Sequence, residues 1–234
     1  MDPQPAAPPE LQPAATRLGA VVSVNVGRSR RVAWRGQTVT SAIWKSPVRG
    51  RVAVGGVNLA GDEQADRSVH GGHDKAVYAY AAGDYRFWQA ELGRELAPGS
   101  FGENLTADGP DLADAVVGDR WQVGSSLLEV CQPRIPCYKL GIRMDDPDFP
   151  RRFAAAGRPG AYLRILVPGE VGAGDPIHLV HRPGHGLTVG TVARAYHADH
   201  RLIPTLLDVP ELPDRWRDWA AEHLGRAARQ RPPA

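Results

Sequence analysis

Glycine and proline interrupt this chain so often that only short helices and strands can form between them. The 234 residues include 26 Gly and 21 Pro. Gly favours turns and Pro lacks an amide donor, so both tend to end regular elements. Between them lie segments that alternate apolar and polar residues, such as 18–27 (LGAVVSVNVG). This period of two is typical of strands, and we expect a β-rich mixed α/β fold with one sizeable core.

Turn residues divide the strand-forming segments further. Residues 30–45 predict two strands around a turn at Gly36, and residues 119–133 predict two strands around a Gly-Ser turn, followed by a loop that carries a cysteine. Further strands are expected within 50–62 and 75–82, and two within 160–183.

Helical spacing is confined to a few segments. Residues 83–96 place Tyr85, Trp88 and Leu92 on one face, with Asp84 as the expected cap. A short helix is expected in 146–157, capped by Asp148 and ended by Gly157. From residue 184 onward the chain predicts two or three short helices. The apolar face of the last one consists of Trp216, Trp219, Ala220, His223 and Leu224.

These patterns divide the chain into three parts. Residues 1–17 are rich in Pro and Ala and are expected to form a disordered tail. Residues 18–182 should form the β-rich domain, and residues 183–234 a three-helix module.

Composition narrows the possible partners and location. A formal net charge of +2 does not indicate a nucleic acid polymer. The N-terminus lacks the basic and apolar regions of a secretory signal, and no apolar run approaches the length of a membrane span. Two cysteines do not form a disulfide framework. We therefore expect a cytoplasmic protein with reduced thiols and no membrane partner.

The stretch PRIPCYKL holds Cys137 on a stiff and basic segment. Nearby Arg134 and Lys139 would increase the thiolate fraction, and the prolines would restrict the loop. The alternative is a small apolar cysteine packed at a strand end. We favour function for Cys137, and packing for Cys131, which continues an apolar strand.

The stretch DRSVHGGHDKAVYAY is a second candidate. Its glycines would let a backbone approach a ligand, while His70 and His73 could transfer protons and Lys75 precedes a strand. A polar loop whose histidines bond backbone carbonyls is an equal alternative. A Cys2His2 zinc site with both cysteines is disfavoured, because the cysteines are spaced more widely than usual.

Two further segments could bind a polar ligand. Lys45, Arg49 and Arg51 in WKSPVRGRV could hold a phosphate, although the segment taken in isolation favours a solvated basic strand end. Asn104 in PGSFGENLT could recognise the edge of a heterocycle, or only cap the turn.

Taken in order, these segments resemble the MOSC family, and within it the YiiM-type bacterial members. The matching stretches cover roughly 18–180, and 188–212 resembles the small three-helix module that follows the MOSC domain there. The resemblance implies a MOSC-type β-barrel with peripheral helices and a small C-terminal α-helical module. It implies that Cys137 ligates the molybdenum of a pterin cofactor (molybdopterin), or carries sulfur as a persulfide. The segments with Lys45, Arg49 and Asn104 match regions linked to cofactor binding, and those with His70 and Lys75 border the pocket.

The expected reaction is the two-electron reduction of N-hydroxylated, purine-like compounds to amines, with His70 or His73 assisting protonation and Lys45, Arg49 and Arg134 binding the cofactor phosphate. Two cysteines cannot hold an iron–sulfur cluster that needs four, so an external electron-donor reductase is expected. A cofactor-loading or sulfur-donor protein and a homodimer are further possible partners. The competing functions are a sulfur carrier using a Cys137 persulfide and a non-catalytic binding module.

Overall fold

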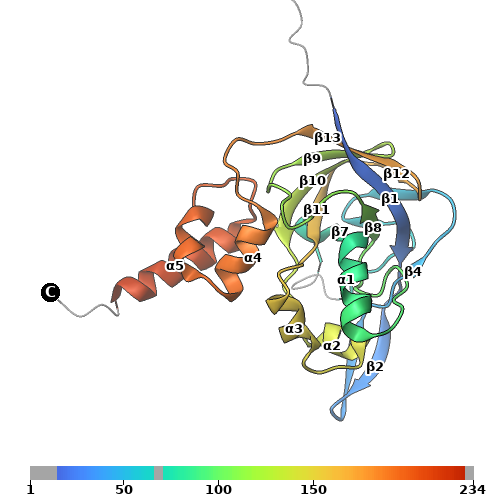
Figure 1. The fold of residues 1–234 in the computed structure, drawn as a ribbon, viewed down its shortest axis with the longest axis horizontal. Helices are drawn as coiled ribbons and strands as arrows, with labels where there is room; N and C mark the ends of the chain where they lie inside the picture. Colours follow the sequence, from blue (N-terminus) through green and yellow to red (C-terminus); the bar gives the residue numbers. More distant parts are fainter. Residues whose placement is uncertain (1–14, 66–70, 230–234) are drawn as a thin grey trace, which may run out of the picture.

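Seven strands form a closed barrel at the centre of the molecule (Figure 1). The computed structural model describes residues 15–65 and 71–229. The barrel strands are β1 (Thr16–Val26), β7 (Val77–Ala81), β8 (Leu105–Asp108), β9 (Arg120–Val123), β10 (Ser126–Pro133), β11 (Ala161–Val167) and β13 (Pro176–His181). They pair in the order β13-β9-β10-β11-β7-β8-β1, and β1 closes the barrel on β13. Only β7 and β8 pair in parallel. The predicted β-rich mixed α/β fold is confirmed.

Shorter strands lie outside the barrel. The predicted turn at Gly36 is confirmed between β2 (Arg30–Trp34) and β3 (Gln37–Ser41), where Gly36 has a φ of 77°. Residues 160–183 contain three strands, although we expected two. The additional strand, β12 (Gly169–Val171), follows Pro168 and pairs outside the barrel with β5 (Val52–Gly55). The remaining strands are β4 (Ser46–Pro47) and β6 (Asn58–Leu59).

The first predicted helix is confirmed as α1 (Ala82–Leu92), but its expected cap is wrong. Ala81 occupies the cap position, and the Asp84 carboxylate accepts a bond from Arg158 Nη1 at 2.5 Å. The second is α3 (Phe149–Ala155), which begins after Asp148 as expected, but without a capping bond from that side chain. The predicted loop that carries a cysteine is confirmed at residues 134–137, but the helix that follows Cys137 directly, α2 (Tyr138–Met144), was not predicted.

Three helices lie beside the barrel in the C-terminal part of the described chain (Figure 1). Their buried apolar residues form a hydrophobic cluster that also includes Val117 of the barrel domain. These helices are α4 (Val189–His197), the 3₁₀ helix η2 (His200–Leu206) and α5 (Asp214–Arg229). None of the helices in the described ranges is long and apolar enough to cross a membrane.

An aromatic cluster supports the segments that surround the candidate site. Tyr80 of β7 packs against Phe101 at a ring distance of 4.4 Å, and Trp88 of α1 stacks on Phe153 of α3 at 5.9 Å. All four side chains are at most 2% exposed. Burial of such large apolar surfaces fixes α1 and α3 against one side of the barrel.

Candidate functional site

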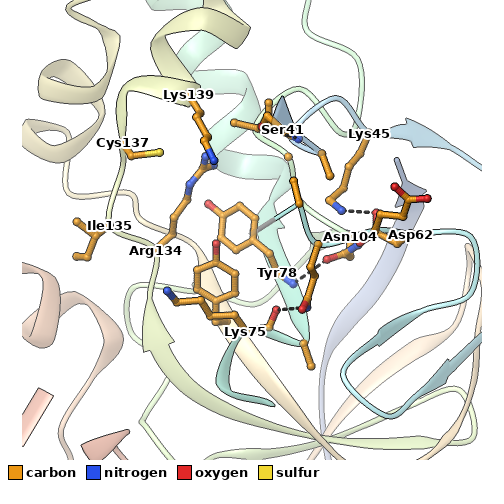
Figure 2. Close-up of a pocket in the computed structure, with 18 residues that line it drawn as sticks. Ser41, Lys45, Asp62, Lys75, Tyr78, Asn104, Arg134, Ile135, Cys137 and Lys139 are labelled. Carbon is orange, nitrogen blue, oxygen red and sulfur yellow. Dashed lines mark hydrogen bonds and ion pairs between the residues drawn. The ribbon is translucent and has the colours of Figure 1, made fainter. Parts of the chain in front are cut away.

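One cavity brings together residues from six separate parts of the chain (Figure 2). We call it the thiol cavity, because Cys137 is one of its lining residues. Five of the sequence-predicted site residues line it: Lys45, Lys75, Asn104, Arg134 and Cys137. Residues that sequence reasoning did not assign to the site line it as well, among them Asp62, Gln64, Tyr78, Lys139 and Tyr162.

Cys137 sits at the junction between β10 and α2. It is half-buried and occupies the position before the helix, with an extended backbone of φ −126° and ψ 172°. Its carbonyl accepts the Leu140 amide at 2.9 Å, so the cysteine closes the first helical turn. Figure 2 shows its sulfur directed toward the guanidinium of Arg134. The prolines at 133 and 136 precede it, consistent with the rigid segment predicted from sequence.

Arg134 is a buried cation in the wall of the thiol cavity. Its residue is 7% exposed, its Nη1 donates to the Phe101 carbonyl, and its guanidinium lies 5.2 Å from the ring centre of Tyr78. Burial raises the pKa of Tyr78, whose hydroxyl donates to the Pro159 carbonyl at 2.8 Å. The phenol is therefore neutral, and Arg134 keeps its positive charge at the cavity.

Lys45 and Asp62 form a buried ion pair across the cavity, with side-chain exposures of 8% and 2%. The Asp62 carboxylate also accepts the Gly27 amide at 2.8 Å and the Asn104 Nδ2 at 2.9 Å. Burial lowers the pKa of Lys45, and the attraction of Asp62 opposes this shift. The ammonium is thus held in place and partly neutralised before any ligand binds.

Asn104 links three segments of the wall. Its Oδ1 accepts the Tyr78 amide at 3.1 Å, while Nδ2 donates to Asp62 and, at 3.3 Å, to the Asn25 carbonyl. The side chain therefore joins β7, β1 and the turn that carries Asp62. Its predicted recognition of a heterocycle stays a prediction.

The two glycines of the His-Gly-Gly stretch shape the chain before β7. Gly72 has a φ of 89°, and its amide donates to Gln64 Oε1 at 2.9 Å. A Cβ on Gly71 would lie 2.4 Å from the same oxygen, so a side chain there would displace Gln64. This turn leads into η1 (His73–Lys75), which places Lys75 on the cavity wall.

Not all the predicted site residues meet at the cavity. The His73 side chain is 60% exposed and does not line the cavity; its Nδ1 lies 3.7 Å from Asp74 Oδ1. Arg49 is exposed beyond β4 and does not line it either. His70 lies outside the described residues. The assigned roles of these three residues stay predictions.

Cys131 occupies the barrel wall in a different environment from Cys137. It is 0% exposed, and its sulfur contacts the carbonyls of Asp74 at 3.0 Å and Tyr162 at 3.3 Å. Burial raises the pKa of its thiol to about 12, which disfavours the thiolate that a metal requires. In the part of the chain that is described, no group of three His, Cys, Asp or Glu side chains is placed to hold a metal ion.

Asp62 and Tyr78, which sequence analysis did not assign to the site, have partners that are distant in sequence. Asp62 pairs with Lys45 seventeen positions away, and Tyr78 of β7 contacts Arg134, which follows β10. Lys139 has a local signal, since it lies two residues after Cys137, and sequence analysis named it only for its effect on the thiol. The assembled cavity places a thiol among the side chains of Lys45, Lys75, Arg134 and Lys139, which suits an anionic ligand.

Comparisons with known proteins agree with this architecture. The MOSC domain family matches residues 66–178. Protein YiiM of Escherichia coli is 37% identical over 173 residues, covering 70% of this chain and 77% of that protein. A protein of Gibberella moniliformis named "Reductase" is 35% identical over 215 residues, covering 89% of this chain but 38% of that protein.

A solved structure extends the match to three dimensions. The crystal structure of YiiM from Geobacillus stearothermophilus superposes with a TM-score of 0.72 at 32% identity, covering 88% of this chain and 98% of that one. The barrel, the order of its segments and these relatives lead to one conclusion: the chain belongs to the MOSC domain family.

Proposed function

We propose that this protein is a molybdenum cofactor-dependent reductase of N-hydroxylated, purine-like compounds, with Cys137 as the ligand of the metal. The observation that supports this most strongly is the position of Cys137 in the wall of a cavity lined by four cationic side chains. The MOSC family is associated with molybdenum chemistry, and one relative is named a reductase.

The donor set of the thiol cavity fits such a cofactor. A cysteine thiolate is a soft ligand suited to a transition metal, and lysine and arginine side chains bind phosphate. Arg134 and Lys139 would hold the anionic part, while the Lys45–Asp62 pair and Asn104 keep the opposite wall in shape. The bound cofactor would supply the two-electron redox chemistry.

The chain itself would bind the substrate and deliver protons. The overall reaction is R–NHOH + 2 e⁻ + 2 H⁺ → R–NH2 + H2O, so two electrons must come from a separate reductase. From the sequence we expect His70 or His73 to donate protons, but the His73 side chain is 60% exposed and does not line the cavity. Among the described side chains we assign this role to Lys75, which lines the same cavity as Cys137.

The test compares Cys137→Ser with Cys131→Ala in protein expressed with molybdate. Molybdenum content is measured by mass spectrometry of the metal, and N6-hydroxyadenine reduction is measured with reduced methyl viologen as electron donor. We expect Cys137→Ser to lose both metal and turnover, and Cys131→Ala to keep stoichiometric metal. Reduction by wild-type protein that contains no molybdenum would refute the proposal.

The same variants distinguish the sulfur-carrier function, which the half-buried position of Cys137 also permits. After incubation with a cysteine desulfurase and cysteine, a persulfide would add the mass of one sulfur atom to the peptide with Cys137. A transferable adduct on wild-type protein, without N-hydroxy reduction, would favour the carrier over the reductase.

A further inference from the structure

A second cavity, of about 330 Å³, adjoins the thiol cavity and lies between the barrel and the C-terminal helices. We call it the aromatic cavity, because Tyr196, Trp216 and Trp219 line it. It shares Lys75, Ile135, Cys137 and Tyr162 with the thiol cavity. Cys137 therefore faces two chambers of different character, one polar and one aromatic.

The aromatic wall comes from α4 and α5. The ring of Tyr196 lies 5.2 Å from that of Trp219 and 5.5 Å from that of Trp216. Tyr196 is 39% exposed and Trp219 is half-buried, so parts of both rings remain accessible. Accessible aromatic rings in a concave site are well suited to stack on a flat ring.

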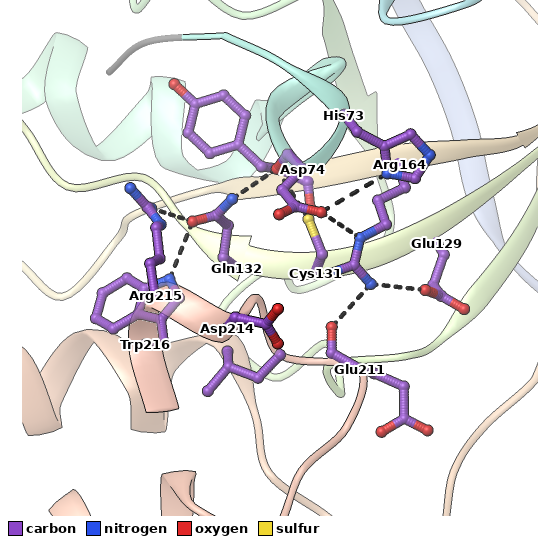
Figure 3. A network of polar contacts seen from close by, with 12 residues as sticks. His73, Asp74, Glu129, Cys131, Gln132, Arg164, Glu211, Asp214, Arg215 and Trp216 are labelled. Carbon is purple, nitrogen blue, oxygen red and sulfur yellow. Dashed lines mark hydrogen bonds and ion pairs between the residues drawn. The ribbon is translucent and has the colours of Figure 1, made fainter. Parts of the chain in front are cut away.

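A polar network fixes this wall against the barrel (Figure 3). The Gln132 side chain of β10 is fully buried; its Oε1 accepts Trp216 Nε1 at 3.0 Å and a donor from Arg215, and its Nε2 donates to the Asp74 carbonyl at 2.6 Å. Because Asp74 belongs to η1, the same glutamine connects α5 to the turn that carries Lys75. The two sides of the aromatic cavity are thus held in a fixed relation.

Arg215 adds a polar edge to the aromatic cavity. The residue is exposed overall, and partial burial of its guanidinium lowers its pKa. A guanidinium carries five N–H donors; Arg215 Nη2 donates to Gln132, and the group lies 5.5 Å from the ring centre of Trp216. The remaining donors suit the ring nitrogens of a heterocycle, and a positive charge disfavours a cationic ligand.

We infer that the aromatic cavity binds the ring of the substrate, which is a planar, uncharged nitrogen heterocycle that carries the N-hydroxylated group. The ring stacks on Trp219 and Tyr196, its nitrogens accept from Arg215, and the N–OH group reaches the wall that contains Cys137. This inference rests on the proposed reductase function for the chemical step, but not for ring binding. It assigns the C-terminal helices a direct part in substrate selection.

The test uses Trp219→Ala and Trp219→Phe in the holoenzyme, with Trp34→Ala as the matched control. Trp34 lies on β2 and lines neither cavity. The kcat/KM for N6-hydroxyadenine is compared with that for acetamidoxime, which has no ring. Because stacking of a base on an aromatic side chain contributes about 1–3 kcal/mol, Trp219→Ala should lower the ratio of the two values about tenfold. Trp219→Phe should largely restore the ratio, and Trp34→Ala should leave it unchanged.

Binding of adenine, which is not reduced, is measured in parallel by titration calorimetry and separates the two proposals. We expect adenine to bind wild type and Trp219→Phe, and to bind Trp219→Ala about tenfold more weakly. An unchanged adenine affinity in folded Trp219→Ala would overturn the inference, even if reduction is observed. Adenine binding that depends on Trp219 in a protein that reduces neither compound would support the ring site and refute the reductase.

Discussion

The Lys45–Asp62 pair allows a prediction whose size and pH dependence both follow from the structure. Asp62→Asn keeps nearly the same shape but removes the only negative charge in contact with the Lys45 ammonium among the described residues. Both side chains are at least 92% buried, given exposures of 8% and 2%. The substitution therefore leaves a buried cation without its partner.

Two estimates set the expected loss in the free energy of unfolding for Asp62→Asn. Removing one partner of a buried ion pair typically costs about 3–5 kcal/mol. The lysine can instead lose its proton, which at pH 7 costs about 5 kcal/mol relative to its usual pKa of 10.5, at about 1.4 kcal/mol per pH unit. We therefore expect Asp62→Asn to lower the free energy of unfolding by about 3–5 kcal/mol at pH 7.

The pH dependence follows from the direction of the pKa shift. In the wild type, burial already lowers the pKa of Lys45, and Asp62 opposes the shift. Without Asp62 the pKa in the folded variant is lower still. A lysine with a lowered pKa destabilises the folded state at low pH, and this penalty is relieved as the pH rises toward 10.5. The deficit of the variant should therefore shrink between pH 7 and pH 9, by up to about 1.4 kcal/mol per unit.

Urea unfolding at pH 7, 8 and 9, followed by tryptophan fluorescence, measures this deficit. Asp208→Asn, at an exposed carboxylate, is the control and should change stability by less than about 0.5 kcal/mol. Adding Lys45→Met to Asp62→Asn should recover part of the loss, because it removes the unpaired cation. A deficit below about 1 kcal/mol at pH 7, or one that stays constant up to pH 9, would refute the reasoning.

Three further predictions concern the buried carboxyl of Glu103, the Gln132 network and the two thiols. Burial raises the pKa of the Glu103 carboxyl above its usual value of 4.5. The free energy of unfolding of the wild type should therefore fall as the pH rises from 4.5 through the raised pKa. Urea unfolding of Glu103→Gln should not show this pH dependence. Gln132→Leu should lower the free energy of unfolding by about 1–3 kcal/mol, because Trp216 Nε1 loses its acceptor. A change of less than about 0.3 kcal/mol in urea unfolding would show that this hydrogen bond does not stabilise the fold. In the native protein, iodoacetamide should alkylate Cys137 and leave Cys131 intact, because Cys131 is 0% exposed. Peptide mass mapping measures both thiols, and alkylation of Cys131 before Cys137 would contradict the prediction.

The sequence by itself determined the local elements and the residue around which the site forms. Alternation and turn residues predicted β1, the hairpin at Gly36 and α1, because these patterns depend on neighbouring residues. The prolines and basic residues around Cys137 predicted a thiol in a rigid cationic segment, and the order of motifs indicated the family. Asp84 shows the limit of such local patterns. Its carboxylate accepts a hydrogen bond from Arg158, which is distant in sequence, and does not cap the helix.

Only the tertiary structure decided which side chains meet. Strand alternation specifies two faces but not the neighbouring strand, so closure of the barrel by β1 on β13 and the parallel β7–β8 pair were not predictable. In the folded chain Lys45 pairs with Asp62, His73 is exposed and Arg49 does not line the cavity. Folding also places Trp219 and Cys137 in the lining of one cavity, although they are 82 positions apart in the chain, because packing energy depends on contact in space rather than on separation in sequence.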